Sequence, residues 1–115
     1  RTEIRCVDAA ANPYLALAGI LAAGLDGIKT TKDDETTKPV YDNIFSLTPE
    51  QREAQGIPNM PDNLYEAISE YKRDPLMAEV LGDHAFAKYL EAKEIEWDQY
   101  RTKVTPWELA RYLAK

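Results

Sequence analysis

Apolar and polar positions follow a helical period over most of the chain, but the first seven residues alternate with the period of a strand. Arg1, Glu3 and Arg5 fall on one side of that alternation, and the uncharged residues between them fall on the other. Because successive side chains of a strand point to opposite faces, this pattern predicts a strand with three charges on one face. A lone strand cannot satisfy its own backbone groups, so the pattern also implies a sheet from outside the chain.

The longest apolar run, YLALAGILAAGL, covers residues 14–25. It is well short of the roughly 20 residues that a bilayer span needs, so we do not expect a membrane segment. We expect a helix that is buried on most sides and whose small residues let neighbouring backbone come close. Asn12 followed by Pro13 predicts its start, and Asp26-Gly27 predicts its end.

The remaining elements are predicted from their caps. Residues 29–47 are polar and lack a period, which favours a loop. Three capping boxes begin at Thr48, Asn63 and Thr105, and Asp74-Pro75 begins a further element. We expect short helices from each box, with breaks at residues 56–61 and at Gly82-Asp83, and a terminal helix that ends near Leu113.

The longest predicted helix runs from about His84 to Val104 and is amphipathic. Its apolar stripe has a spacing of three to four residues, with the stem of a lysine included: Phe86, Leu90, Lys93, Trp97, Tyr100 and Val104. The opposite face is charged. The chain is therefore predicted to be mostly α-helical, with one N-terminal strand and about five helices.

Composition narrows the class of protein. With 20 acidic and 14 basic residues the net charge is −6, which argues against a nucleic-acid-binding protein. Cys6 is the single cysteine, so it forms no internal disulfide, and a reducing cytoplasmic location is expected. The sequence does not begin with Met, which we interpret as a C-terminal segment of a longer protein.

The opening charges allow two interpretations. Glu3 could bind a divalent cation, since carboxylate oxygens suit Mg²⁺ or Mn²⁺, while Arg1 and Arg5 bind anions on either side. By spacing alone, the second interpretation, an exposed strand face with weak pairing between its charges, is favoured. His84 has no second ligand at metal spacing, which favours a surface or capping role, and Cys6 is expected to be a buried apolar residue.

Aromatic residues are expected to pack rather than bind ligands. Trp97 and Trp107 are assigned to the core or to a subunit interface, and Tyr14 to the core. The sequence shows no glycine-rich phosphate loop, no Cys-x-x-Cys pair and no nucleophile beside a base. No self-contained active site is predicted.

The opening RTEIRCVDAAANPYLALAGILAAGLDGI closely resembles the R-x-E-x-R…D…ANPYLA…AGLDGI segment of class I, bacterial-type glutamine synthetases. Further similar stretches follow in order: DNIFSLTPEQREAQGI, MPDNLYEAI and EVLGDHAFAKYLEAKEIEWDQYRTKVTPWELARYL. The resemblance covers essentially all of residues 1–115. It implies the C-terminal segment of the catalytic domain, without the N-terminal domain and most of the catalytic sheet.

The resemblance implies an α+β catalytic domain that ligates ammonia to L-glutamate with ATP, through γ-glutamyl phosphate. Glu3 corresponds to a glutamate that binds the second metal ion, Mg²⁺ or Mn²⁺. Arg5 corresponds to an arginine that binds the glutamate substrate, and Arg1 to a catalytic arginine near the ATP phosphates. A cytoplasmic dodecamer is implied for the whole enzyme. Because the other metal ligands of the family lie upstream, we predict that the fragment alone is inactive.

One position departs from many bacterial members of the family. Their loop that matches DNIFSLTPEQ carries a tyrosine that is reversibly adenylylated, whereas Phe45 stands at that position here. Without a hydroxyl group Phe45 cannot be modified, so no adenylylation site is expected. The stretch KEIEWDQYRTKVTPWE is more similar to the feedback-inhibited subdivision, which suggests control by glutamine or by a protein partner.

Two other functions stay open at this point. The segment could act chiefly as a helical assembly or regulatory module, through its acidic helices and the terminal TPWELARYLAK. It could also belong to a related ligase that acts on another amine or acid, such as a polyamine.

Overall fold

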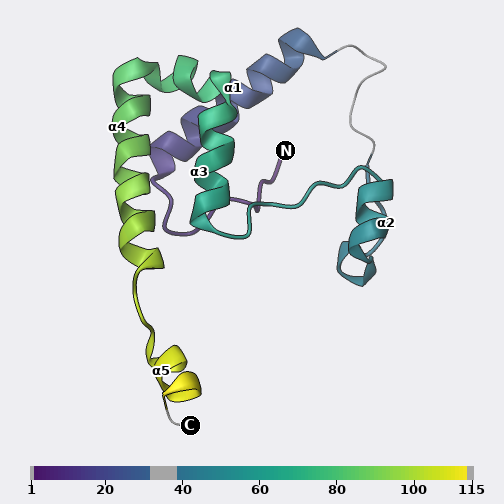
Figure 1. Ribbon diagram of the computed structural model, residues 1–115. Helices are drawn as coiled ribbons and strands as arrows, with labels where there is room; N and C mark the ends of the chain where they lie inside the picture. Colours follow the sequence, from purple (N-terminus) through teal and green to yellow (C-terminus); the bar gives the residue numbers. More distant parts are fainter. Residues whose placement is uncertain (1, 32–38, 114–115) are drawn as a thin grey trace. The chain divides into compact units, whose positions relative to one another are not determined.

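The computed structural model describes residues 2–31 and 39–113, which form five α-helices and a short 3₁₀ helix (Figure 1). The chain divides into two compact units, residues 1–60 and 61–115. None of the helices within the described ranges is long and apolar enough to cross a bilayer.

The strand expected over the first seven residues is not formed. Residues 2–6 have no regular secondary structure, and no strand occurs anywhere in the described part of the chain. The alternation of charged and uncharged residues is real, but a strand needs a neighbour to accept and donate its backbone hydrogen bonds. The described residues supply no such neighbour, so this prediction is wrong for the chain by itself.

Helix α1, Pro13–Thr30, begins where the sequence predicts. The Asn12 side chain accepts hydrogen bonds from the backbone N–H groups of Tyr14 and Leu15, and Pro13 occupies the first turn. The helix continues past the expected end at Asp26-Gly27 and is capped by Thr31, whose N–H donates to the Gly27 carbonyl at 2.9 Å. Gly27 keeps a helical backbone conformation and does not adopt the left-handed conformation that would have ended the helix.

Most of the large apolar side chains of α1 are exposed, contrary to the expectation of a helix buried on most sides. No residue of α1 is buried. Tyr14 is 82% exposed and Leu17 and Leu21 are each 65% exposed, so the assignment of Tyr14 to a core is wrong. An apolar helix is buried only where another apolar surface covers it, and its sequence alone does not supply that surface.

Helix α2, Pro49–Ala54, follows the 3₁₀ helix η2, Ile44–Ser46, and has both ends fixed by hydrogen bonds. At its start, Thr48 and Gln51 form the predicted capping box. At its end, the N–H groups of Gly56 and Ile57 donate to the carbonyls of Glu53 and Arg52, each at 2.9 Å. Gly56 has a φ of 67°, the left-handed conformation that this termination requires.

Helices α3, Leu64–Arg73, and α4, Pro75–Arg101, pack against each other (Figure 1). Tyr65 near the start of α3 meets Trp97 near the end of α4, with ring centroids 5.9 Å apart. Tyr71 near the end of α3 stacks on Phe86, with centroids 4.5 Å apart. The contacts run in opposite order along the two helices, so α3 and α4 form an antiparallel hairpin.

The predicted stripe of α4 faces this hairpin interface over most of its length. Phe86, Leu90, Lys93 and Trp97 are half-buried, while Tyr100 and Val104 at the far end are exposed. On α3, Ile68 is 6% exposed and is the one buried hydrophobic residue within the described ranges. The helical period therefore identified the packed face of α4 correctly.

Gly82 bends α4 between its first turns and its long C-terminal part (Figure 1). Its φ of 73° and ψ of 153° lie in a region that is open essentially to glycine alone. The sequence predicted this break. The helix ends at Arg101 rather than near Val104.

Helix α5, Pro106–Tyr112, starts at the third predicted capping box. The Glu108 N–H donates to Thr105 Oγ1 at 3.2 Å, and the Thr105 N–H donates to Glu108 Oε2 at 2.7 Å. These bonds satisfy two of the N–H groups that a helix start leaves free. The described residues are therefore mostly α-helical, as predicted, and they do not show the α+β class.

Candidate functional site

The candidate site lies in the segment without regular secondary structure that precedes α1. There, Arg5 Nε donates to Glu3 Oε1 at 2.6 Å, forming an ion pair. Both side chains are open to solvent: that of Arg5 is 83% exposed and that of Glu3 is 62% exposed. The structure thus brings together the predicted metal ligand and the predicted substrate-binding arginine. The third residue of the predicted site, Arg1, lies outside the described residues.

Asp8 ends this segment with a turn. Its Oδ1 accepts from the Ala10 N–H at 2.7 Å, and its carbonyl accepts from the Ala11 N–H at 3.0 Å. The carboxylate of Asp8 is therefore bound to backbone, whereas that of Glu3 is bound to a side chain. These local bonds lead the chain from the charged segment to the Asn12 cap of α1.

Glu3 is chemically suited to hold a divalent cation, since its carboxylate oxygens are the ligands that Mg²⁺ and Mn²⁺ prefer. A full site needs several ligands. In the part of the chain that the structure describes, no three His, Cys, Asp or Glu residues lie close enough to share a metal ion. The described residues therefore fit one ligand of a metal site and do not make up a whole one.

Other sequence candidates occupy ordinary surface positions. His84 is exposed, as expected of a surface residue. Cys6 is also exposed, so the prediction of a buried apolar cysteine is wrong. The alternation that placed Cys6 opposite the charges predicts burial only when a second layer covers that face. Trp97 is half-buried in the hairpin, while Trp107 on α5 is 64% exposed and stacks edge-on with Tyr112.

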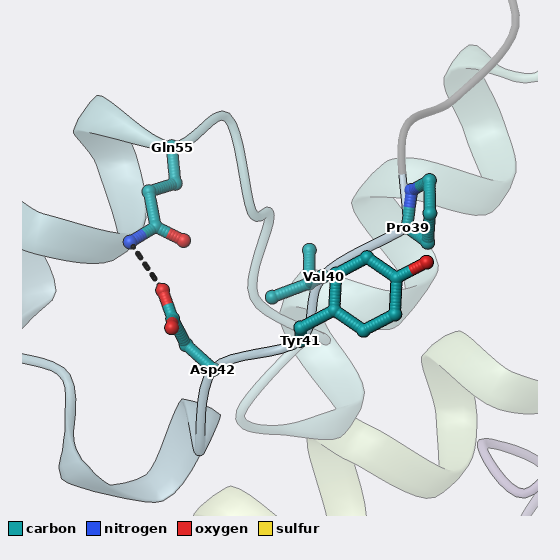
Figure 2. A pocket seen from close by; sticks show the side chains of 5 residues that line it. All are labelled: Pro39, Val40, Tyr41, Asp42 and Gln55. Carbon is teal, nitrogen blue, oxygen red and sulfur yellow. Dashed lines mark hydrogen bonds between the residues drawn. The ribbon is translucent and has the colours of Figure 1, made fainter.

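A hollow of about 350 Å³ lies between the segment that precedes η2 and the end of α2 (Figure 2). Its lining residues are Pro39, Val40, Tyr41, Asp42 and Gln55. One hydrogen bond crosses it, from Gln55 Nε2 to Asp42 Oδ2 at 3.2 Å (Figure 2). Sequence reasoning missed this contact, because nothing in the chain marks a link between residues 13 positions apart.

Phe45, in the neighbouring η2, is fully exposed. The Asn43 side chain caps this short helix by accepting from the Phe45 N–H at 3.2 Å. The turn therefore presents the aromatic ring to solvent. A modifying enzyme could reach this position, but the phenylalanine ring offers it no nucleophilic atom.

Displaced pKa values occur at a helix cap, in a surface ion pair and in the α3–α4 hairpin. Hydrogen bonds from Thr105 lower the pKa of Glu108, and a hydrogen bond from Lys88 lowers the pKa of Glu91. Burial raises the pKa of Tyr71, with a smaller contribution from Tyr89. These shifts accompany caps and packing, so they mark structural contacts.

Comparison with known proteins gives a consistent result. Residues 1–112 match the family model described as glutamine synthetase, catalytic domain. The chain is 49% identical over 115 residues to the glutamine synthetase of Clostridium saccharobutylicum and 51% identical over 114 residues to that of Methanosarcina mazei. It is 45% identical over 113 residues to that of Staphylococcus aureus.

These alignments cover 98–100% of the chain but 25–26% of each relative. The chain therefore spans about a quarter of the length of the curated relatives that it matches.

Proposed function

The chain belongs to the glutamine synthetase catalytic-domain family, and we propose that it is the C-terminal part of the catalytic domain of a class I glutamine synthetase. The whole enzyme would ligate ammonia to L-glutamate with ATP, through γ-glutamyl phosphate, in the cytoplasm. The observation that carries this proposal is the family match over residues 1–112, which includes the segment that holds Glu3 and Arg5.

Glu3 would contribute one carboxylate to a Mg²⁺ or Mn²⁺ site whose other ligands come from elsewhere in the enzyme. When bound, such a cation neutralises negative charge on the phosphates of ATP. Arg5 would bind a carboxylate of L-glutamate, because its planar guanidinium pairs a carboxylate through two parallel hydrogen bonds. Arg1 would bind the phosphates of ATP.

These roles suit phosphoryl transfer. Negative charge is spread over the transferred group as the bond to the leaving oxygen breaks, and fixed positive groups stabilise that charge where it develops. Binding of L-glutamate by Arg5 would position the γ-carboxylate to attack the terminal phosphorus of ATP, so that the bond to the bridging oxygen breaks, ADP leaves and γ-glutamyl phosphate forms. Ammonia then displaces phosphate from the acyl phosphate to give glutamine.

The α+β class and the N-terminal strand are proposed for the whole catalytic domain. Residues 2–7 have the alternation of a strand but no neighbouring strand among the described residues. Next to a strand contributed by the rest of the domain, their backbone groups would gain partners, and Glu3 and Arg5 would lie on one face. A dodecamer is likewise proposed for the whole enzyme.

The test of the proposed function is glutamine formation by the whole enzyme. With L-glutamate, ammonia, ATP and Mg²⁺ or Mn²⁺, the enzyme should release glutamine and phosphate in equal amounts. Glu3→Ala should reduce the rate by roughly 100-fold or more and weaken metal binding, since loss of even an outer-shell partner of a metal ligand costs about 10–100-fold in affinity or activity. Residues 1–115 alone should form no glutamine. A whole enzyme that accepts a different amine or acid in place of ammonia and glutamate would refute the assignment.

A second candidate function, an assembly or regulatory module, is favoured by the exposed apolar side chains of α1. Leu17, Leu21 and Ile28 are 65%, 65% and 81% exposed. Exposed apolar faces of this kind mark contact surfaces. Loss of the oligomer in a Leu17→Asp variant of the whole enzyme, with metal binding retained, would support this role beside the catalytic one.

Control by adenylylation is not proposed, because Phe45 stands at the position of the modified tyrosine. Incubation of the whole enzyme with an adenylyltransferase and labelled ATP should leave the segment of residues 39–47 unlabelled. A Phe45→Tyr variant provides the matched control, since Phe45 is fully exposed and a hydroxyl group there would be accessible. Control by glutamine or by a protein partner is proposed in its place.

A further inference from the structure

Glu3 and Arg5, which have different roles in the proposed site, form an ion pair with each other. Arg5 Nε donates to Glu3 Oε1 at 2.6 Å. The residues are only two positions apart in a segment without regular secondary structure, and their side chains reach each other there. Pairing over this spacing requires no other element of the fold.

This pairing competes with both proposed tasks. A guanidinium group that points its N–H donors at Glu3 has fewer of them free for the carboxylate of a substrate. A divalent cation bound to Glu3 would place two positive charges beside the guanidinium of Arg5. Like charges repel, so the cation weakens the attraction that holds Arg5 on Glu3.

We propose that the Glu3–Arg5 ion pair restrains Arg5 until a divalent cation binds Glu3, so that the enzyme binds L-glutamate more tightly after the metal than before it. This inference rests on the proposed function, because it takes the roles of Glu3 and Arg5 from it. It adds a regulatory coupling between the metal and the amino-acid substrate that passes through two neighbouring side chains. Arg5 binds the substrate, and Glu3 positions Arg5 in the metal-free enzyme.

The expected coupling is modest because both side chains are exposed. Exposed ion pairs contribute between nothing and the equivalent of about a fivefold change in an equilibrium constant. Release of Arg5 should therefore change the affinity for L-glutamate by up to about fivefold. The sign of the change is the distinctive feature, since removal of a metal ligand should improve substrate binding in the absence of metal.

The test is calorimetric titration of the whole enzyme with L-glutamate after the metal has been removed with a chelator. The Glu3→Gln variant keeps the shape of the side chain but loses the charge that attracts Arg5. We expect it to bind L-glutamate up to about fivefold more tightly than the wild-type enzyme under metal-free conditions. Glu3→Ala should give the same gain, which guards against a local distortion specific to glutamine.

Asp8→Asn provides the matched control for charge. It removes one negative charge five residues away, from a carboxylate that binds the backbone N–H of Ala10 and not an arginine. If general electrostatics caused the gain, Asp8→Asn would produce it too. We expect no gain from Asp8→Asn, and we expect the Glu3→Gln gain to disappear when Arg5→Ala is added.

The outcomes test the proposed role of Arg5 in substrate binding separately from the proposed coupling to the metal. If Arg5→Ala does not weaken L-glutamate binding in the presence of Mn²⁺, the proposed role of Arg5 is wrong. If Arg5→Ala does weaken it but Glu3→Gln gives no metal-free gain, the proposed function stands and the coupling is wrong. An equal gain in Asp8→Asn would also overturn the coupling.

Discussion

Helix α1 and the α3–α4 hairpin contain similar kinds of residue but bury them very differently. Helix α1 is the most continuously apolar stretch of the sequence, and no residue in it is buried. Helix α3 is strongly amphipathic and contains Ile68, which is 6% exposed. Helix α3 packs against the part of α4 that follows Gly82, where Phe86 and Trp97 contact it, whereas no residue of α1 is buried.

The difference shows that burial depends on partners more than on hydrophobicity. An amphipathic pair of neighbouring helices can bury its stripe locally, because few residues must be ordered to bring the two faces together. A helix that is apolar on most sides needs several surrounding surfaces. We therefore expect the hairpin to retain its packing in the 115-residue chain, and α1 to depend on the rest of the enzyme.

The largest expected effect concerns Ile68. In the 115-residue chain, Ile68→Ala should lower the free energy of unfolding of the hairpin by about 2–3 kcal/mol, because it removes buried methyl groups and leaves a cavity. Leu17→Ala in α1 should change stability by no more than about 0.5 kcal/mol, since Leu17 is 65% exposed. Urea unfolding followed by circular dichroism measures both variants.

The same two substitutions in the whole enzyme sharpen the comparison. If the rest of the enzyme covers α1, Leu17→Ala should become costly there, by about 2–3 kcal/mol, as expected for Ile68→Ala. Ile68→Ala should have a similar cost in both contexts. A Leu17→Ala variant that stays neutral in the whole enzyme would show that α1 remains exposed after assembly.

The next effect contrasts two glycines. Gly82→Ala should destabilise the hairpin unit by about 1–3 kcal/mol, because the backbone there has a φ of 73° that L-residues rarely adopt. Gly24→Ala in α1 should instead stabilise its helix by roughly 0.5–1 kcal/mol, since Gly24 is helical and a Cβ there meets no atom within 4 Å. Opposite signs in thermal unfolding followed by circular dichroism would confirm the difference, and equal signs would contradict it.

The local signals of the sequence predicted most of the fold. The caps at Asn12, Thr48, Asn63, Asp74 and Thr105 all begin helices in the structure. A cap predicts well because its hydrogen bonds join residues two or three positions apart, so the sequence contains the whole interaction. The break at Gly82 and the stripe of α4 were also predictable from local sequence, because a glycine and a helical period of apolar residues are visible within a few turns.

Apart from the expected ends of α1 and α4, the predictions that failed required distant partners. The strand of residues 1–7, the buried α1 and the buried Cys6 each presuppose a surface that no neighbouring residue supplies. Of the candidate site, the local contact between Glu3 and Arg5 follows from their spacing, while their roles come from the family resemblance. Neither spacing nor composition could identify the remaining metal ligands, because no cluster of them occurs among the described residues.

A smaller effect is expected from the ion pair that joins Lys72 of α3 to Glu94 of α4. Both side chains are about half exposed, so their coupling in a double-mutant cycle of Lys72→Met and Glu94→Gln should be about 0–1 kcal/mol. The coupling should fall further in 1 M salt, which screens exposed charges. A coupling above 2 kcal/mol would mean that charge, and not the packing around Ile68, holds the hairpin together.

The smallest expected effect concerns the pKa values of Glu108 and Glu91, which are lowered by different partners. The pKa of Glu108 is lowered chiefly by the backbone N–H and then the hydroxyl of Thr105, and that of Glu91 by its hydrogen bond and charge attraction with Lys88. Because each folded-state pKa lies below the ordinary value of 4.5, each carboxylate stabilises its helix above that pH. The contribution is lost as the pH falls through the folded-state pKa.

Salt should separate the two carboxylates in a titration followed by carboxyl carbon NMR. In 1 M salt the pKa of Glu91 should return toward 4.5, because screening weakens its attraction to Lys88. The pKa of Glu108 should stay low, because its bonds to Thr105 are short, directional and barely affected by dissolved ions. In a Thr105→Val variant only the pKa of Glu108 should rise, since the hydroxyl is gone and the cap is weakened. A Glu108 pKa as sensitive to salt as that of Glu91 would mean that general electrostatics, and not the capping box, fixes the start of α5.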